Sequence, residues 1–177
     1  MIFLALGSNL HGPWGSPADA LDRAVEALAA EGVAVVARSH WYRSAPYGGV
    51  AAGDFVNGVV AVATHRPPEA LMRLCHRVER AAGRARRARW GSRTLDLDLI
   101  AYHDVVINPA RRGVGRWRAS GRVPLTVPHP DMASRAFVLV PLREIAPGWH
   151  HPVTGLTADV MLRRLKRSAE GRILEPA

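Results

Sequence analysis

The sequence predicts an α+β fold: a ferredoxin-like split βαβ sandwich with a four-stranded antiparallel core sheet, helices on one face, and a C-terminal hairpin and helices. The first observation is the order of patterns over residues 2–100, which reads strand, helix, strand, strand, helix, strand. The second is that both helical segments begin near a proline and end at a glycine. The third is size, because 177 residues that are 48% hydrophobic are typical of one domain, which we expect to span 1–177.

The first three elements follow from apolar runs and helix-terminating residues. The apolar run at 2–6 predicts a buried strand, which the stretch GSN at 7–9 ends. Ser16 is the expected N-cap of a helix that Gly32 stops. The β-branched and aromatic residues at 33–44 then predict a second strand.

The next three elements complete the core pattern. After a flexible loop at 45–54, the alternation at 55–64 predicts a third strand that places Phe55 and Asn57 on one face. A second helix is expected over 67–83. The run RTLDLDLI predicts the fourth strand, with its leucines on one face and its two aspartates on the other.

The C-terminal part carries weaker patterns. A hairpin is expected at 104–109, followed by a basic, glycine-rich loop at 110–122 that has no periodicity. A helix is expected from about 131 to 144, between two prolines. Thr157 is the expected N-cap of a last amphipathic helix over 158–167.

The charge of the chain favours an anionic partner. Lysine and arginine number 24 against 15 aspartate and glutamate residues, which gives a formal net charge of +9. Much of the excess lies in residues 84–93 and 111–122. Because the excess is localised, it favours a phosphate-binding pocket over a uniform nucleic-acid surface.

Cysteine usage and apolar runs indicate the compartment. Cys75 is the single cysteine and lies in an apolar helical pattern, so an intramolecular disulfide is excluded and the thiol is expected to pack in the core. The N-terminal stretch lacks the basic lead of a signal peptide, and no apolar run has the length of a bilayer-spanning helix. We expect a soluble, cytoplasmic protein.

Asp96 and Asp98 form the D-x-D pattern of the fourth strand. Two carboxylates this close disfavour joint ionisation unless cations lie between them or water screens them. The pattern therefore has two interpretations, a solvated strand face or a site for Mg²⁺, which binds carboxylates together with substrate phosphates and water.

Five arginines lie just before this strand, between and beside Gly83 and Gly91: Arg84, Arg86, Arg87, Arg89 and Arg93. Guanidinium groups on a loop can contact several phosphate oxygens, although a solvated basic loop or a nucleic-acid patch has the same composition. The chain contains neither a P-loop nor a dinucleotide-binding glycine motif. A nucleotide site would therefore depend on arginines and metal.

Aromatic and amide side chains offer a second kind of site. Phe55 and Asn57, on one strand face, combine a π surface with a hydrogen-bonding amide, which suits a flat heterocycle. Taken singly, Phe55 and Phe137 favour core packing over ligand stacking. His129, between two prolines, fits either a phosphate contact or a turn before a helix.

Together these segments resemble a known family. LALGSNL, WYRSAPYG, FVN, RWGSRTLDLDLI and VPHPDMASRAFVLVPL are similar, in the same order, to the 6-hydroxymethyl-7,8-dihydropterin pyrophosphokinases of folate biosynthesis. The similarity extends from residue 2 to about residue 147. It implies an ATP-dependent diphosphotransferase that transfers the β,γ-diphosphate of ATP to the hydroxymethyl group of the pterin and releases AMP.

The resemblance also implies roles for individual residues. Asp96 and Asp98 would bind two Mg²⁺ ions that bridge the triphosphate of ATP, the co-substrate, and Arg84 and Arg93 would complete the catalytic set. The other implied nucleotide contacts are Glu79, Arg86, Arg87, Trp90, His129 and Arg135. The implied pterin contacts are Ser44, Ala45, Tyr47, Phe55, Asn57 and Phe137. The expected partners are these small molecules, with no nucleic acid and no membrane, and the expected state is a monomer.

The chain departs from the family pattern mainly in the arginine-rich and glycine-rich insertion at 110–122. Pro124 stands where some relatives carry a phosphate-facing arginine, and we expect Arg118 or Arg122 to substitute for it. The segment between Gly83 and Trp90 is one residue shorter than in the family pattern.

Two other functions fit part of the sequence. A basic RNA-binding module would share the sheet topology and the charge, but the aromatic run of such modules is absent. A metal-dependent phosphohydrolase would usually need more carboxylates and histidines than one D-x-D pattern supplies.

Overall fold

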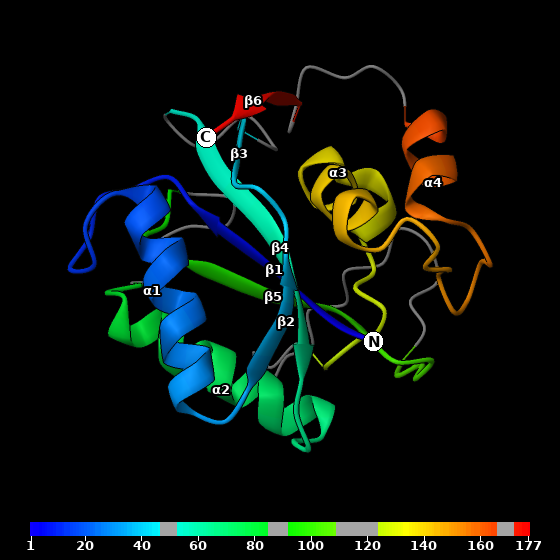
Figure 1. The fold of residues 1–177 in the computed structure, drawn as a ribbon, viewed down its shortest axis with the longest axis horizontal. Coiled ribbons are helices and arrows are strands. Elements are labelled where there is room, and N and C mark those ends of the chain that lie inside the picture. Colours follow the sequence, from blue (N-terminus) through cyan, green and yellow to red (C-terminus); the bar gives the residue numbers. More distant parts are fainter. Residues whose placement is uncertain (47–52, 85–91, 109–123, 166–171) are drawn as a thin grey trace.

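The computed structural model describes residues 1–46, 53–84, 92–108, 124–165 and 172–177. In these residues it contains an open antiparallel sheet in the order β5, β1, β4, β3, β6, with β2 also paired to β4 (Figure 1). The strands are β1 (Ile2–Ser8), β2 (Ala34–Arg38), β3 (Tyr42–Ser44), β4 (Phe55–Ala63), β5 (Asp96–Tyr102) and β6 (Ile173–Pro176). The helices are α1 (Pro17–Ala30), α2 (Pro68–Ala81), the short 3₁₀ helix η1 (Met132–Ser134), α3 (Ala136–Ile145) and α4 (Ala158–Arg164).

Helices lie on both faces of this sheet, with α1 and α2 on one side and α3 and α4 on the other (Figure 1). Alternate residues of the strands therefore enter two apolar clusters. Leu4 belongs to the cluster under α1 and α2, and Phe3 to the cluster under α3 and α4. The expectation of helices on one face alone is wrong, because Leu139 and Leu142 of α3 bury apolar surface on the second face.

The D-x-D strand is confirmed. Leu95, Leu97 and Leu99 have exposed fractions of 0%, 0% and 2%, and they belong to the cluster under α1 and α2. The pleat places Asp96 and Asp98 on the opposite face, where their side chains are 22% and 31% exposed. The aspartates thus face the side of the sheet that α3 only partly covers.

The single strand expected at 33–44 is divided into β2 and β3. Arg38 pairs with Val60 and Tyr42 with Asn57, so this segment has one more residue than β4 over the same stretch. Trp41 fills the irregular turn, and its ring lies so close to Gly58 that a Cβ there would be 2.2 Å from a ring carbon. The packing of Trp41 against Gly58 therefore interrupts the strand. Local strand propensity does not reveal this tertiary contact.

The helix expected at 131–144 is also divided. Arg135 has the extended torsions φ −111° and ψ 99°, which separate η1 from α3. Hydrogen bonds from Arg135 to Asp98 and Asp131 accompany this break. The helix is thus interrupted at Arg135, the residue whose side chain is directed toward Asp98.

The remaining elements agree in part with the sequence. The first two helices are confirmed, with a capping box between Ser16 and Asp19 in α1. The hairpin expected at 104–109 is wrong for the described part, 104–108, where Ile107 instead forms an isolated bridge with the distant Val127; residue 109 and the insertion at 110–122 fall outside the described residues. Two strands beyond the expected four result from the division of 33–44 and from β6, which no pattern indicated. Among the described helices, none is long and apolar enough to cross a membrane.

Candidate functional site

A cavity of about 190 Å³ opens between the sheet face and the start of α3. Its floor comes from β1, β3, β4 and β5, and its wall from the segment that leads into α3. The lining residues are Gly7, Ser44, Ala45, Phe55, Asn57, Arg93, Asp96, Asp98, His129, Arg135 and Phe137. The cavity therefore combines a charged half with an aromatic and amide half.

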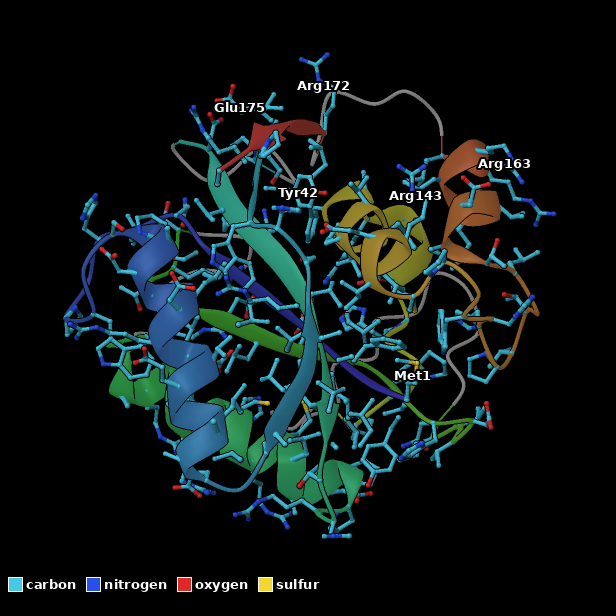
Figure 2. The ribbon with its side chains drawn as sticks, in the orientation of Figure 1. Met1, Tyr42, Arg143, Arg163, Arg172 and Glu175 are labelled. Carbon is cyan, nitrogen blue, oxygen red and sulfur yellow. The ribbon has the colours of Figure 1, made fainter. Side chains whose placement is uncertain are left out.

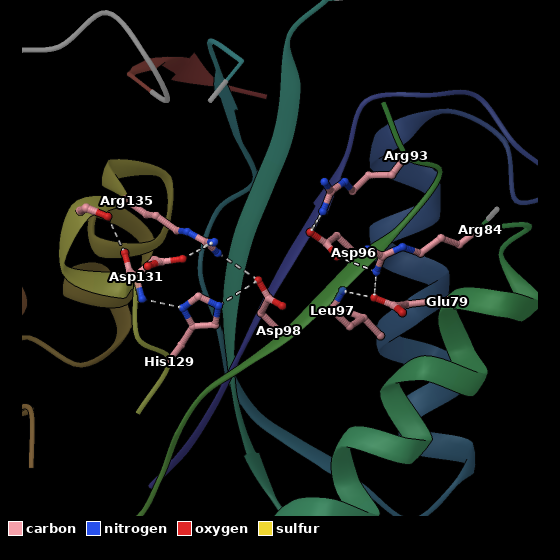
Figure 3. Close-up of polar contacts among 10 residues, drawn as sticks. Glu79, Arg84, Arg93, Asp96, Leu97, Asp98, His129, Asp131 and Arg135 are labelled. Atoms are coloured by element: carbon pink, nitrogen blue, oxygen red, sulfur yellow. Dashed lines mark hydrogen bonds and ion pairs between the residues drawn. The ribbon is translucent and has the colours of Figure 1, made fainter. Parts of the chain in front are cut away.

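Asp96 is paired with two arginines (Figure 3). Nη1 of Arg84 lies 2.6 Å from one carboxylate oxygen, and Nη1 of Arg93 contacts the other. The backbone N–H of Arg93 donates to Oδ1 of Asn9 at 2.7 Å, which holds this segment against the end of β1. Arg93 is thus held at the cavity, and Arg84 adjoins the cavity through its contact with Asp96.

Asp98 faces a second cationic group (Figure 3). Nη1 of Arg135 donates to Oδ2 of Asp98 at 3.1 Å, and Nε2 of His129 lies 3.7 Å from the same oxygen. The backbone N–H of Asp131 donates to Nδ1 of His129 at 3.1 Å, so the neutral imidazole carries its proton on Nε2, toward Asp98.

The titration of this pair follows from burial and charge. Burial opposes ionisation of Asp98, but His129 and Arg135 outweigh it and hold the pKa of Asp98 below its usual range. Burial lowers the pKa of His129, although the charge of Asp98 opposes that effect. An ionised Asp98 therefore faces a histidine that is readily neutral at the site.

Glu79 supports the charged half from beneath the sheet edge. Its side chain is 3% exposed, contacts Nη1 of Arg84, and accepts a hydrogen bond from the backbone N–H of Leu97 at 2.9 Å. Burial raises the pKa of Glu79, an effect that Arg84 partly offsets. Because Leu97 lies between the two aspartates, Glu79 helps to fix β5 at the point where both carboxylates project.

The other half of the cavity presents a hydrogen-bonded amide and two phenyl rings. Nδ2 of Asn57 donates to Oγ of Ser44 at 2.7 Å, and Asn57 is only 5% exposed. Phe55 on β4 and Phe137 on α3 line the same space. A flat ring with polar edges would find π surfaces and an oriented amide there.

Gly7 lies between the two halves. It pairs with Asn57 on β4 and with Asp96 on β5, so the two residues flank one glycine in the sheet. A Cβ on Gly7 would lie 2.8 Å from Oδ1 of Asn57, which is closer than ordinary contact. The missing side chain therefore leaves room for the Asn57 amide beside the strand that carries Asp96.

The residues present fit Mg²⁺ when substrate supplies the other ligands. The described residues contain no group of three metal-ligating side chains, so they form no all-protein cage. Asp96 and Asp98 offer hard oxygen atoms at the cavity, and Mg²⁺ usually binds one or two carboxylates, phosphates and water. The arginines that now pair with these carboxylates would be free to contact phosphates once a cation replaces them.

The structure brings together most of the site residues that the sequence indicated. Ten of them line the cavity, and Glu79 and Arg84 adjoin it through the contacts to β5 and Asp96. Four fall outside the described residues: Tyr47, Arg86, Arg87 and Trp90.

Sequence reasoning missed three residues at the site. Gly7 and Asn9 belong to the GSN stretch that was interpreted only as the end of a strand, and Asp131 follows His129 and Pro130. A small and polar stretch directly after a fully buried strand is the signal that could have found the first two.

Comparison with known proteins identifies the family. Residues 3–147 match the model of the 7,8-dihydro-6-hydroxymethylpterin-pyrophosphokinase family. The chain belongs to this family. The match contains every residue that lines the cavity, so the family assignment and the site geometry concern the same part of the molecule.

Several relatives support membership of the pyrophosphokinase family, and each is named 2-amino-4-hydroxy-6-hydroxymethyldihydropteridine pyrophosphokinase. The protein of Methylorubrum extorquens is 42% identical over 146 residues, which cover 82% of each chain. The protein of Synechocystis is 38% identical over 167 residues, or 94% of this chain and 76% of the relative. That of Haemophilus influenzae is 38% identical over 145 residues, covering 81% and 80%.

Proposed function

We propose that this chain transfers the β,γ-diphosphate of ATP to the hydroxymethyl group of 6-hydroxymethyl-7,8-dihydropterin, giving AMP and the pterin diphosphate in folate biosynthesis. Family membership supports the reaction and ATP as co-substrate. The observation that carries the proposal is one cavity that joins a carboxylate and guanidinium half to an aromatic and amide half across Gly7.

The charged half suits a metal-bound triphosphate. Asp96 and Asp98 would hold Mg²⁺, and we propose two ions, whose charge would neutralise the triphosphate and polarise its phosphoryl oxygens. Arg84, Arg93 and Arg135 would then contact phosphate oxygens in place of the aspartates.

The uncharged half suits the pterin. Phe55 and Phe137 would stack on the ring, while Asn57 and Ser44 would hydrogen-bond its polar edge, with the backbone near Ala45 completing the pocket. Because Nδ2 of Asn57 is already held by Ser44, the amide has a fixed orientation before the pterin enters.

The reaction needs alignment more than a covalent nucleophile. The pterin hydroxyl oxygen forms a bond to the β-phosphorus, the bond from that phosphorus to the α,β-bridging oxygen breaks, and AMP leaves as the hydroxyl loses its proton. Arg84 and Arg93, which pair with Asp96, would stabilise the negative charge that develops on the transferring group and on the leaving AMP. The pterin hydroxymethyl group, beside Asn57, and the phosphates, beside Asp96, would meet near Gly7, which pairs with both residues.

We further propose a ferredoxin-like core within a single domain. The order of strands β5, β1, β4 and β3 supports a ferredoxin-like core, and one sheet that serves both apolar clusters supports a single domain. We also propose a cytoplasmic monomer that acts on small molecules and uses neither nucleic acid nor membrane.

Direct detection of AMP tests the function. The protein is incubated with Mg²⁺, ATP and 6-hydroxymethyl-7,8-dihydropterin, and nucleotides are separated by chromatography. We expect AMP in equal amount to the pterin diphosphate, and none when the pterin is omitted. Formation of ADP or inorganic phosphate in place of AMP would refute the assignment.

A further inference from the structure

A carboxylate at the end of α3 joins that helix to β3, outside the cavity. Glu144 accepts hydrogen bonds from the Tyr42 hydroxyl at 2.8 Å and from the backbone N–H of His40 at 3.1 Å. Nδ1 of His40 lies 2.6 Å from the same carboxylate. Tyr42 lies between β3 and α3 (Figure 2), so three contacts converge where the helix meets β3 and the residues just before it.

Electrostatics fix which partner donates. Burial, together with the hydrogen bond to Glu144, raises the pKa of Tyr42, so the phenol keeps its proton at neutral pH. Burial opposes ionisation of Glu144, but hydrogen bonds from Tyr42 and His40 hold the pKa of Glu144 below its usual range. The contact is therefore a hydrogen bond from a phenol to a carboxylate, a charge-assisted type that is stronger than a neutral one. Because the Glu144 side chain is 28% exposed, solvent weakens this hydrogen bond.

On the sheet side, Tyr42 is next to the proposed pterin pocket. β3 has only three residues, and its register places Tyr42 opposite Asn57 and Ser44 opposite Phe55. Tyr42 and Ser44 are two residues apart, so they project on one face. A shift of Tyr42 would therefore move the same short strand whose Ser44 holds the Asn57 amide.

On the helix side, Glu144 lies seven residues after Phe137. Seven residues make nearly two helical turns, so both side chains lie on one side of α3, about 10 Å apart along its axis. Phe137 lines the cavity at the start of the helix, and Glu144 anchors its last turn. The helix thus connects the anchor to the wall of the pocket.

We propose that Tyr42 and Glu144 are positioning residues that set the separation between the α3 wall and the sheet wall of the pterin pocket. Phe137 forms the first wall, and Phe55 with Asn57 the second. A flat ring binds best when both walls are held at the stacking distance before it enters. The inference rests on the proposed function, since it assumes that the pterin occupies this half of the cavity.

Two substitutions test the proposal: Tyr42→Phe removes the hydroxyl and keeps the ring, and Glu144→Ala removes the acceptor. Since one hydrogen bond to a partly exposed carboxylate is lost, we expect the KM and the Kd for 6-hydroxymethyl-7,8-dihydropterin to rise about threefold to tenfold. The KM for ATP should stay within about twofold. Glu144→Gln keeps an oxygen acceptor for Tyr42 and should restore most of the pterin affinity.

A matched control removes a carboxylate on the other side of the sheet. Glu31 follows α1, is 46% exposed, and pairs with Arg66 and Arg77. Glu31→Ala deletes two ion pairs and should leave both KM values unchanged. This control separates loss of a carboxylate in general from loss of the contact with Tyr42.

Several outcomes would overturn the inference. If Glu144→Ala fails to fold, Tyr42→Phe still tests the proposal, because it keeps the phenyl ring and its packing. An unchanged Kd for the pterin in Tyr42→Phe would show that the contact between Tyr42 and Glu144 does not position the pocket. Equal increases in the KM for pterin and for ATP would indicate a general structural effect. Pterin Kd is measured by equilibrium fluorescence, without turnover. A wild-type protein that binds the pterin but forms no AMP would refute the proposed function and leave this inference standing.

Discussion

The substitution Gly7→Ala tests whether the room that Gly7 leaves for the Asn57 amide is needed for pterin binding. The added Cβ would lie 2.8 Å from Oδ1 of Asn57, which is 0.6 Å less than the 3.4 Å at which ordinary contact begins. Asn57 cannot yield freely, because it is 5% exposed and its Nδ2 is bonded to Ser44. Either the amide turns and loses that bond, or the strands separate.

The expected effect is large enough to measure. Forcing an extra carbon into a packed site costs about 1–3 kcal/mol. If the amide rotates, most of this cost falls on pterin binding, and about 2 kcal/mol corresponds to a rise of roughly thirtyfold in the Kd for 6-hydroxymethyl-7,8-dihydropterin. Gly7 also pairs with Asp96, so kcat should fall as well, while ATP affinity should change by less than about threefold.

The assay is equilibrium fluorescence binding of the pterin, together with initial rates of AMP formation. Gly148→Ala is the matched control, because a Cβ at Gly148 would meet no heavy atom within 4 Å. It should bind the pterin like the wild type. If Gly7→Ala also binds the pterin within twofold of the wild type, pterin binding does not depend on the room that Gly7 leaves for the Asn57 amide, and our interpretation of this glycine is wrong.

The other predictions concern the metal, the core and the thiol. Asp96→Ala and Asp98→Ala should each reduce Mg²⁺-dependent AMP formation about 100-fold or more while circular dichroism stays native, and wild-type turnover in both would refute the metal role. Leu97→Ala deletes a fully buried side chain and should lower the free energy of unfolding by about 2–5 kcal/mol in urea titrations; a loss below about 1 kcal/mol would contradict its core position. Burial raises the pKa of the Cys75 thiol to about 12, so iodoacetamide at pH 8 should label it only after unfolding, and rapid labelling of the native protein would contradict that burial.

The parts of the fold that the sequence predicts well are those with strong local signals. Ser16 and Gly32 delimit the first helix closely, because an N-cap and a stop residue act within one turn. The alternation of Leu97 with Asp96 and Asp98 defines the faces of β5, because a buried strand cannot shift by one residue without burying carboxylates.

The parts that sequence reasoning misses depend on distant partners. β6 has four mostly exposed residues and no alternation, and it exists because β3 offers an edge for pairing. Trp41 interrupts the strand at 33–44 because Gly58, on another strand, leaves room for its ring. The contact of Glu144 with Tyr42 joins residues 102 positions apart, so no local pattern contains it.

The arginine pairing of Asp96 and Asp98 bears on the choice between a solvated strand face and a metal site. On a solvated face, water screens the repulsion between neighbouring carboxylates. Ion pairs with arginines would then stabilise the fold very little. Here Arg84, Arg93 and Arg135 are only 18%, 22% and 11% exposed, so the chain places desolvated cations beside the aspartates at the cavity. Cations held this way compensate the carboxylates when no ligand is bound. If Mg²⁺ takes over that compensation, as we propose, the same guanidinium groups would face the triphosphate, and one arrangement of charges would serve both states.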